Sequence, residues 1–271
     1  MGWVPEAQRV VAAGASPSRW AFVLHGILGS GNNWRSFCRR LVKEAPGWGF
    51  VLVDLRNHGR SSGAPPPHTV DACADDLVRL GTVEGISPAC VIGHSFGGKV
   101  ALRYGQRAPS PPSQLWVLDA TPGAWSGASP GQTEVAQVIA ALRAVPLPVP
   151  RRDALVDTLT GMGLSTMLAR WMTTNLRPGE GGLVWTFDLD AVEQMLLDYL
   201  AQDAWPWLED PARTTDVHVV RAARSDRWSP EELGRFEVIR HRLHLHVLPD
   251  AGHWLHVDNP DGLRALLLSA L

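Results

Sequence analysis

Short apolar runs alternate with helix-like stretches through the first 120 residues, and this alternation limits the possible folds more than any other feature. The runs are Trp20–Gly26, Gly49–Leu55, Ala89–His94 and Gln114–Ala120. Unbroken apolar runs of this length are typical of parallel strands buried on both faces. Helices are expected between them, over Trp34–Lys43, Thr69–Val83 and Phe96–Arg107. The pattern predicts an α/β protein with a mostly parallel central sheet flanked by helices.

The alternation stops after Thr121 and resumes near the C-terminus. From about Pro122 to Trp205 no strand is evident, and three stretches carry apolar residues at helical spacing: Glu134–Ala144, Gly163–Met172 and Asp190–Leu200. The remaining expected elements are an early antiparallel strand at Arg9–Ala13, strands at Asp216–Ala223 and Leu243–Pro249, and a closing helix at Pro260–Leu271. We therefore expect a core formed by residues 1–121 and 206–271, with a helical insertion at 122–205.

Composition restricts the class of partner. The chain has 271 residues, 45% of them hydrophobic, which is enough for one large domain with an insertion. A net charge of −2 and the lack of a basic run argue against nucleic acid and against a membrane surface. The apolar runs are too short to span a bilayer, the N-terminus does not look like a secretory signal, and three scattered cysteines suggest reduced thiols. These features predict a cytoplasmic protein, either a monomer or a homodimer.

A serine between two glycines, Gly93-x-Ser95-x-Gly97, lies between a predicted strand and a predicted helix. In this context the sequence predicts a sharp turn that holds the serine in a strained conformation, with its hydroxyl exposed at the carboxyl edge of the sheet. The alternative is a glycine-rich turn with an incidental serine. A serine hydroxyl is a weak nucleophile unless a base takes its proton and an acid orients the base.

Candidates for the base and the acid follow Ser95 in chain order, as this architecture requires. His253 lies in a loop after the last predicted strand and is the preferred base, with His256 on the same loop as the alternative. Asp226 comes just after the strand that follows the insertion and is the preferred acid. Asp119, at the end of an earlier strand, is the alternative acid.

The developing oxyanion of an acyl-transfer reaction needs two backbone N–H donors. We expect one from Phe96, directly after the serine, and the other from Ile27 or Leu28 in the loop after the first long apolar run. His25 and Gly26 bend that loop and are candidates for the substrate pocket. Neither a metal nor an organic cofactor is called for.

Five stretches together resemble the α/β-hydrolase superfamily, and in particular a small serine esterase branch with VDxRNHGxS and GHSxGGK motifs: FVLHGILGSGNNW, VLVDLRNHGRS, VIGHSFGGKVAL, RSDRW and AGHWLHVDNP. The resemblance implies that Ser95 is the nucleophile and His253 the base, with Phe96 and Ile27 as oxyanion donors. Some members of the branch use the acid that matches Asp119. The resemblance also implies that 122–205 is a helical lid, inserted after the sixth strand of the fold, and that DLRNHGRS is a structural turn.

Tryptophans suggest the character of the pocket. Five of the 12 lie between residues 122 and 207, and Trp125, Trp171 and Trp254 are the pocket candidates among all of them. Large apolar side chains beside the serine favour an apolar acyl or aromatic group. The sequence thus predicts a serine hydrolase acting on small carboxylic esters, or thioesters. The alternatives are a C–C bond hydrolase, lactonase or cofactor-free perhydrolase with the same residues, and a non-enzymatic ligand receptor.

Overall fold

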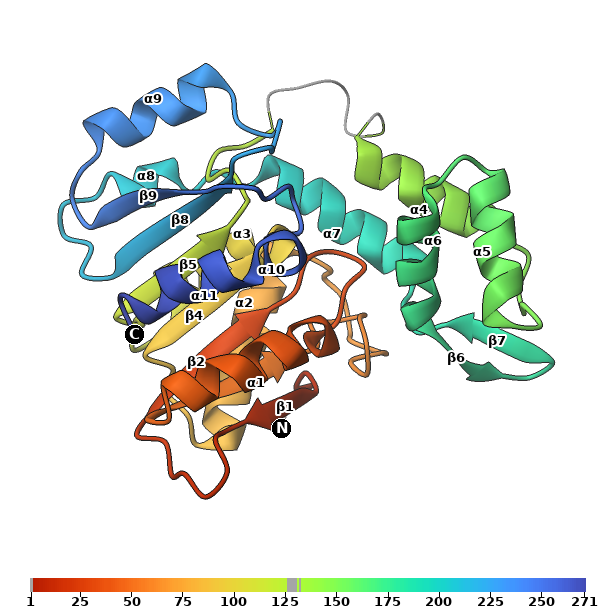
Figure 1. Cartoon of the computed structure of the whole chain (residues 1–271), viewed down its shortest axis with the longest axis horizontal. Helices are drawn as coiled ribbons and strands as arrows, with labels where there is room; N and C mark the ends of the chain where they lie inside the picture. The colour runs from red at the N-terminus through yellow and green to blue at the C-terminus, as the bar shows by residue number, and fades with distance from the viewer. Residues whose placement is uncertain (1, 126–130, 132) are drawn as a thin grey trace.

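A seven-stranded sheet forms the centre of the molecule in the computed structural model, which describes residues 2–125, 131 and 133–271 (Figure 1). The strand order is β1-β3-β2-β4-β5-β8-β9, and all neighbours are parallel except β1 and β3. The strands are β1 (Ala7–Val10), β2 (Arg19–Leu24), β3 (Trp48–Val53), β4 (Cys90–His94), β5 (Gln114–Leu118), β8 (Asp216–Ala222) and β9 (Leu243–Leu248). The mostly parallel sheet and the antiparallel early strand predicted from sequence are confirmed.

Helices cover both faces of this sheet. On one face lie α1 (Arg35–Glu44) and α11 (Pro260–Leu268), and on the other α2 (Val70–Glu84), α3 (Phe96–Arg107) and α9 (Pro230–Val238). Every residue of β3 and β4 is buried, because the two layers enclose the central strands from both sides. This burial explains why the strand sequences are continuous apolar runs and do not alternate with polar residues.

The insertion between β5 and β8 projects from one end of the sheet (Figure 1). It contains α4 (Glu134–Ala144), α5 (Arg152–Gly161), α6 (Thr166–Met172), η3 (Thr173–Asn175), β6 (Leu176–Gly179), β7 (Gly182–Trp185) and α7 (Leu189–Ala201). The short helix α8 (Trp205–Leu208) follows it and lies back at the sheet. Residues 126–130 and 132 of the predicted insertion lie outside the described part. In this chain the insertion follows the fifth strand, β5, whereas the family resemblance implied that it follows the sixth.

Two features of the insertion differ from the sequence prediction. It is not wholly helical, because β6 and β7 pair as an antiparallel hairpin with Leu176 opposite Trp185. Helix α5 was also not expected from the sequence. Each of the two strands has only four residues, and one contains Pro178 while both contain glycine, so neither shows the apolar run that marked the core strands.

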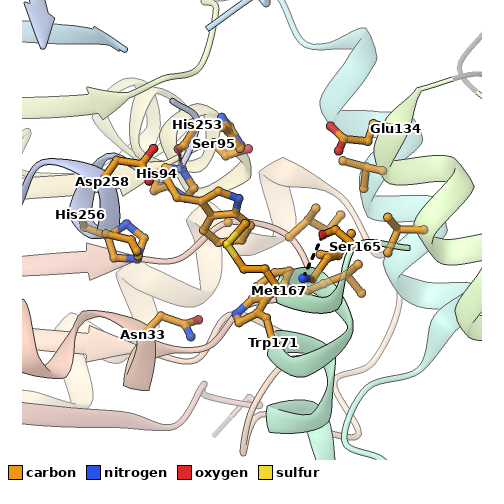
Figure 2. A pocket seen from close by; sticks show the side chains of 18 of the residues that line it. Asn33, His94, Ser95, Glu134, Ser165, Met167, Trp171, His253, His256 and Asp258 are labelled. Atoms are coloured by element: carbon orange, nitrogen blue, oxygen red, sulfur yellow. Dashed lines mark hydrogen bonds between the residues drawn. The ribbon is translucent and has the colours of Figure 1, made fainter. Parts of the chain in front are cut away.

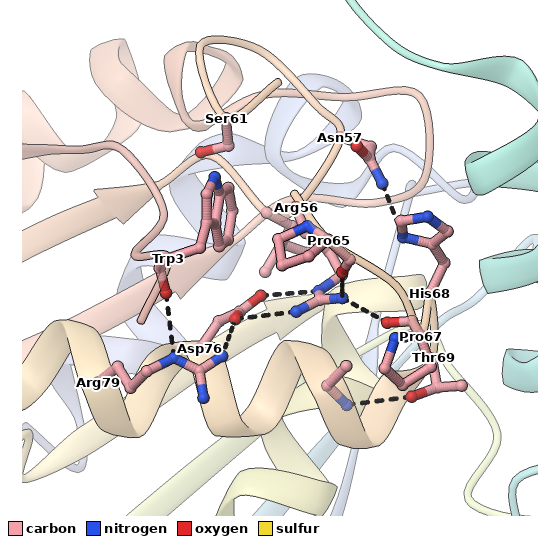
Figure 3. A network of polar contacts seen from close by, with 12 residues as sticks. Trp3, Arg56, Asn57, Ser61, Pro65, Pro67, His68, Thr69, Asp76 and Arg79 are labelled. Atoms are coloured by element: carbon pink, nitrogen blue, oxygen red, sulfur yellow. Dashed lines mark hydrogen bonds and ion pairs between the residues drawn. The ribbon is translucent and has the colours of Figure 1, made fainter. Parts of the chain in front are cut away.

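A buried ion pair holds the loop after β3 against α2 (Figure 3). Arg56 donates from Nε and Nη2 to the two carboxylate oxygens of Asp76, at 2.7 and 2.9 Å. Its Nη1 donates to the carbonyls of Pro65 and Pro67. Asp54, at the start of the loop, accepts from the Gly31 N–H at 2.7 Å. These contacts fix the chain of the DLRNHGRS segment and agree with its interpretation as a structural turn.

The three cysteines, Cys38, Cys73 and Cys90, are buried in the core and form no disulfide.

Within the described part of the chain, none of the helices has both the length and the apolar character needed to cross a bilayer. The remaining short helices are η1 (Gly31–Trp34), in the loop after β2, and α10 (Leu255–Asp258), after β9.

Candidate active site

Ser95 occupies a strained turn between β4 and α3. Its φ and ψ are 51° and −116°, a region that residues other than glycine rarely adopt. A Cβ on Gly93 would collide with the carbonyl of Gly97, and one on Gly97 would lie 2.6 Å from the His25 carbonyl oxygen. The glycines are therefore required by the closeness of strand, turn and helix, and the sharp, strained turn expected between strand and helix is present.

Asp119 and His253 form a hydrogen-bonded pair at the same edge of the sheet. Asp119 follows β5 directly, has a φ of 47° and is fully buried. Its Oδ2 accepts from His253 Nδ1 at 2.8 Å, and its Oδ1 accepts from the Ala222 N–H at 3.1 Å and from Trp228 Nε1 at 3.0 Å. His253 Nδ1 is therefore the protonated ring nitrogen, which leaves Nε2 as the basic one.

The surroundings keep Asp119 charged and His253 neutral. Burial opposes the charge on Asp119, but hydrogen bonds from His253, Trp228 and Ala222 outweigh it and lower its pKa to about 2. Burial lowers the pKa of His253 below its usual value, against the opposing effect of the Asp119 carboxylate. At neutral pH the histidine is thus an uncharged base with a fixed tautomer.

The structure does not place Asp226, the acid preferred from sequence, next to His253. Asp226 lies in the loop between β8 and α9 and lines a cavity beside Ser95, whereas the carboxylate on His253 belongs to Asp119. The indole of Trp228, two residues further along that loop, takes the position against Asp119. Both aspartates follow strands that end at this edge, so the sequence could not rank them by distance.

The alternative base, His256, packs against Trp34, whereas the carboxylate of Asp119 contacts His253. Its ring stacks on Trp34 with centroids 4.2 Å apart, and burial lowers its pKa to about 4. His94, just before the serine, donates from Nε2 to the carbonyl of His253 at 2.7 Å, and the centroids of the two rings lie 4.7 Å apart. His94 thus anchors the loop that carries His253, a role that its place beside Ser95 in the motif did not reveal.

Hydrogen bonding distinguishes the two oxyanion candidates in the loop after β2, Ile27 and Leu28. The Leu28 N–H donates to His58 Nε2 at 3.0 Å and is therefore occupied. This leaves Ile27 as the stronger candidate on that loop. Phe96 is the first residue of α3, where the backbone N–H has no partner within its own helix.

Gly26 keeps the approach to the serine open. A Cβ there would lie 3.0 Å from His94 Nδ1 and 3.4 Å from the Ser95 Cβ. His25, in contrast, is not a pocket residue: it is buried, its Nε2 accepts from the Leu55 N–H at 3.0 Å, and it lines neither cavity at Ser95 among the residues described. Its side chain stabilises the turn and does not face substrate.

Two cavities meet at Ser95. The first, of about 380 Å³, also contains His253 and has apolar walls from the insertion and the His253 loop (Figure 2). The side chains that make it apolar are Val135, Val138, Met167, Leu168, Trp171 and Trp254. Trp171 lies edge-on to Trp254 with centroids 4.5 Å apart, so two of the predicted pocket tryptophans meet there.

The second cavity, of about 240 Å³, lies on the other side of the serine and is more polar. Trp125 lines it, together with Tyr199, Lys99 and Arg227. Arg227 is 3.9 Å from Glu134 of α4, and both side chains border the two cavities. The sequence analysis did not single out Tyr199, Lys99 or Arg227, because nothing in the local sequence shows that they converge on Ser95.

A serine, a carboxylate and a histidine placed in this chain order at the carboxyl edge of a mostly parallel sheet are the arrangement of an α/β-hydrolase. The sequence profile of the Alpha/beta hydrolase family matches residues 21–266, so the chain belongs to that family. It is an enzyme of the hydrolase class, and the resemblance inferred from its motifs is confirmed.

Named relatives agree with this assignment. The chain is 29% identical over 253 residues to the sn-1-specific diacylglycerol lipase ABHD11 of Mus musculus, covering 92% of this chain and 79% of the mouse protein. It is 25% identical over 250 residues to Esterase YbfF of Escherichia coli (strain K12), covering 90% of each. The solved structure of a marine microorganism esterase has the same fold, with a TM-score of 0.87 at 24% identity over the whole of both chains.

Proposed function

We propose that this enzyme hydrolyses carboxylic esters with an apolar acyl or aromatic group through an acyl-enzyme on Ser95. The observation that carries the proposal is the 2.8 Å contact between Asp119 and His253, in a cavity that His253 shares with a strained serine. A ligand receptor would have no use for such an activated hydroxyl. The names of the lipase and the esterase relatives support an ester as the substrate.

The proposed reaction assigns one role to each of these groups. Ser95 Oγ attacks the ester carbonyl, its proton passes to His253 Nε2, and the carbonyl electron pair moves onto the oxygen. The N–H groups of Ile27 and Phe96 stabilise that oxygen. The tetrahedral intermediate then expels the alcohol, which takes the proton from His253, and water attacks the acyl-enzyme by the same route. Asp119 stabilises the imidazolium in each half and keeps its own charge throughout.

The acyl group belongs in the first cavity. Its walls include the six apolar side chains named above, and transfer of a hydrocarbon chain from water into such a wall is favourable by about 0.8 kcal/mol per buried CH₂. Five of these six side chains come from α4 and α6 of the insertion, which supports the role of residues 122–205 as a lid. The second cavity is left for the alcohol.

Replacement of the nucleophile tests this function. Ser95→Ala removes the only atom that can form the acyl-enzyme, so we expect p-nitrophenyl ester hydrolysis to fall by about 10⁶-fold, to the background of the assay. A fluorophosphonate probe should label the wild-type enzyme and not the variant. Among esters graded by acyl length, the wild type should prefer chains longer than acetyl.

A surface serine provides the control. Ser113, before β5 at the opposite edge of the sheet, is exposed, and Ser113→Ala should retain wild-type activity and labelling. Substantial hydrolysis by Ser95→Ala, or labelling of the chain at another serine, would refute the proposed function.

A further inference from the structure

Tyr199 of α7 reaches the nucleophile from the insertion. Tyr199 and Ser95 line the same cavity, and the ring of Tyr199 is 5.8 Å from the ring of Phe96, the residue directly after the serine. Tyr199 is therefore placed beside the reacting group, although its position in the sequence is far from any of the motifs. Asp119 and His253 account for the base side of the serine, and Tyr199 occupies a different side.

Lys99, the lysine of the GHSFGGK segment, fixes where Tyr199 lies. Its Nζ donates to the carbonyls of Gly123 at 2.7 Å, Tyr199 at 3.0 Å and Gln202 at 3.0 Å, and it lies 4.6 Å from the centroid of the Tyr199 ring. The lysine is 3% exposed. Because Gly123 and Gln202 lie near the two ends of the insertion, one ammonium group ties both ends to the helix that begins at the serine.

Tyr199 faces the same space as the expected oxyanion donors. The second cavity is lined by Ser95, Ile27, Phe96 and Tyr199 together. A carbonyl oxygen that sits between the Ile27 and Phe96 N–H groups is thus on the side of the serine where the phenol lies. Burial raises the pKa of Tyr199, so its hydroxyl keeps its proton and stays a hydrogen-bond donor at neutral pH.

We propose that Tyr199 is a further catalytic residue, whose hydroxyl donates a third hydrogen bond to the ester oxygen as negative charge develops there. The inference rests on the proposed function. In the free enzyme Tyr199 lines the cavity that Ser95 also lines. As the Oγ–C bond forms, the serine proton passes to His253 and the carbonyl electron pair moves onto the oxygen, to which the phenol then donates. Tyr199 keeps its proton throughout, so no further reactant is needed.

Tyr199→Phe tests this role, because it removes the hydroxyl and keeps the ring against Lys99 and Phe96. Loss of one preorganised oxyanion donor costs about 10²- to 10³-fold in kcat, and with two backbone donors remaining we expect a loss of about 10- to 100-fold. KM should change by less than about threefold, because the bond forms mainly in the transition state. The rate constant for fluorophosphonate labelling of Ser95 should fall by a similar factor.

The only other tyrosine of the chain is a matched control. Tyr104 is buried in α3 and lines neither cavity, so Tyr104→Phe should keep the wild-type kcat. The thermal midpoints of both variants separate a lost fold from a lost hydrogen bond. A Tyr199→Phe enzyme with kcat within twofold of wild type, or with its loss confined to KM, would overturn the inference alone. A wild-type enzyme that neither hydrolyses esters nor reacts with the probe would overturn the proposed function as well.

Discussion

The hydrogen bonds of a single carboxylate decide how the candidate base is prepared. Both oxygens of Asp119 are occupied, Oδ2 by His253 and Oδ1 by Trp228 and Ala222, so the carboxylate cannot rotate away from the ring. The histidine tautomer is fixed before substrate arrives. Asp226, which faces the second cavity, has no such contact with His253 among the residues described.

Exchange of each carboxylate for an amide separates the two aspartates. Asp119→Asn places an amide on His253 Nδ1 and favours the wrong tautomer, so we expect kcat to fall by about 10⁴-fold, as for the same change in a serine protease. Asp226→Asn should change kcat by less than about fivefold. Steady-state hydrolysis of a p-nitrophenyl ester measures both, and the reverse order of the two effects would return the acid role to Asp226.

The pH profile of the wild type is a second readout of the same pair. His253 must be neutral to accept the serine proton, and its pKa lies below the usual 6.5. Activity should therefore stay constant as the pH falls to about 6.5 and decline only below it. Loss of activity that begins well above pH 7 would contradict a neutral, desolvated base.

Among the elements, the loop between β3 and α2 depends on charge more than on apolar packing. Arg56 and Asp76 have side chains 3% and 2% exposed, and each charge is removed from water. The pair links this loop to the body of α2 (Figure 3). Breaking such a pair leaves the remaining charge buried, which costs more than the pair itself contributes.

Arg56→Met should destabilise the protein by about 3 kcal/mol, at the low end of the range for a broken buried pair, because Arg79 still contacts Asp76. Arg242→Met, in an exposed pair with Asp216, should change the free energy of unfolding by less than about 1 kcal/mol. Urea denaturation at neutral pH gives both values. Equal losses in the two variants would show that burial of the Arg56 pair is unimportant.

The core elements could be predicted from sequence because a buried strand and an amphipathic helix each impose a pattern on their own residues. The predicted strand at Leu243–Pro249 and the observed β9 at Leu243–Leu248 differ by one residue. The hairpin of β6 and β7 was missed because its four-residue strands contain glycine and proline. Boundaries and short polar elements depend on tertiary contacts, which leave no periodic signal in the sequence.

A residue of the candidate site could be predicted only where the neighbouring sequence carries a recognisable pattern. Ser95 is marked by its glycines, and His253 by the loop after the last strand. The choice of Asp119 over Asp226 depends on which strand end faces the histidine, and the approach of Tyr199 to Ser95 depends on how the insertion folds back. These are distances between remote parts of the chain, so sequence spacing carries no information on them.

For the whole molecule, burial of histidines makes stability depend on pH. His58 and His94 are fully buried near the site, at 0% and 2% exposure. Burial lowers the pKa of His58 to about 3, with His25 adding to the effect, and burial together with His253 and His256 lowers that of His94 well below its usual value. His58 also accepts from the Leu28 N–H through Nε2, a hydrogen bond that requires the neutral ring.

These two histidines should make the protein sensitive to mild acid. Their folded pKa values lie below those of the unfolded chain, so the stability is fully present above pH 6.5 and is lost as the pH falls toward the folded values. Between about pH 6 and 4.5 the unfolded chain binds two more protons from this pair, and each proton contributes about 1.4 kcal/mol per pH unit. This pair should thus contribute about 3 kcal/mol per pH unit to the fall in the free energy of unfolding, as measured by urea denaturation at fixed ionic strength. His58→Gln should reduce the slope by about 1.4 kcal/mol per pH unit whatever it does to the stability at pH 7, because one proton-binding difference is gone. A free energy of unfolding that is flat from pH 6.5 to 5, or a slope unchanged in His58→Gln, would mean that these rings are already protonated within the folded protein.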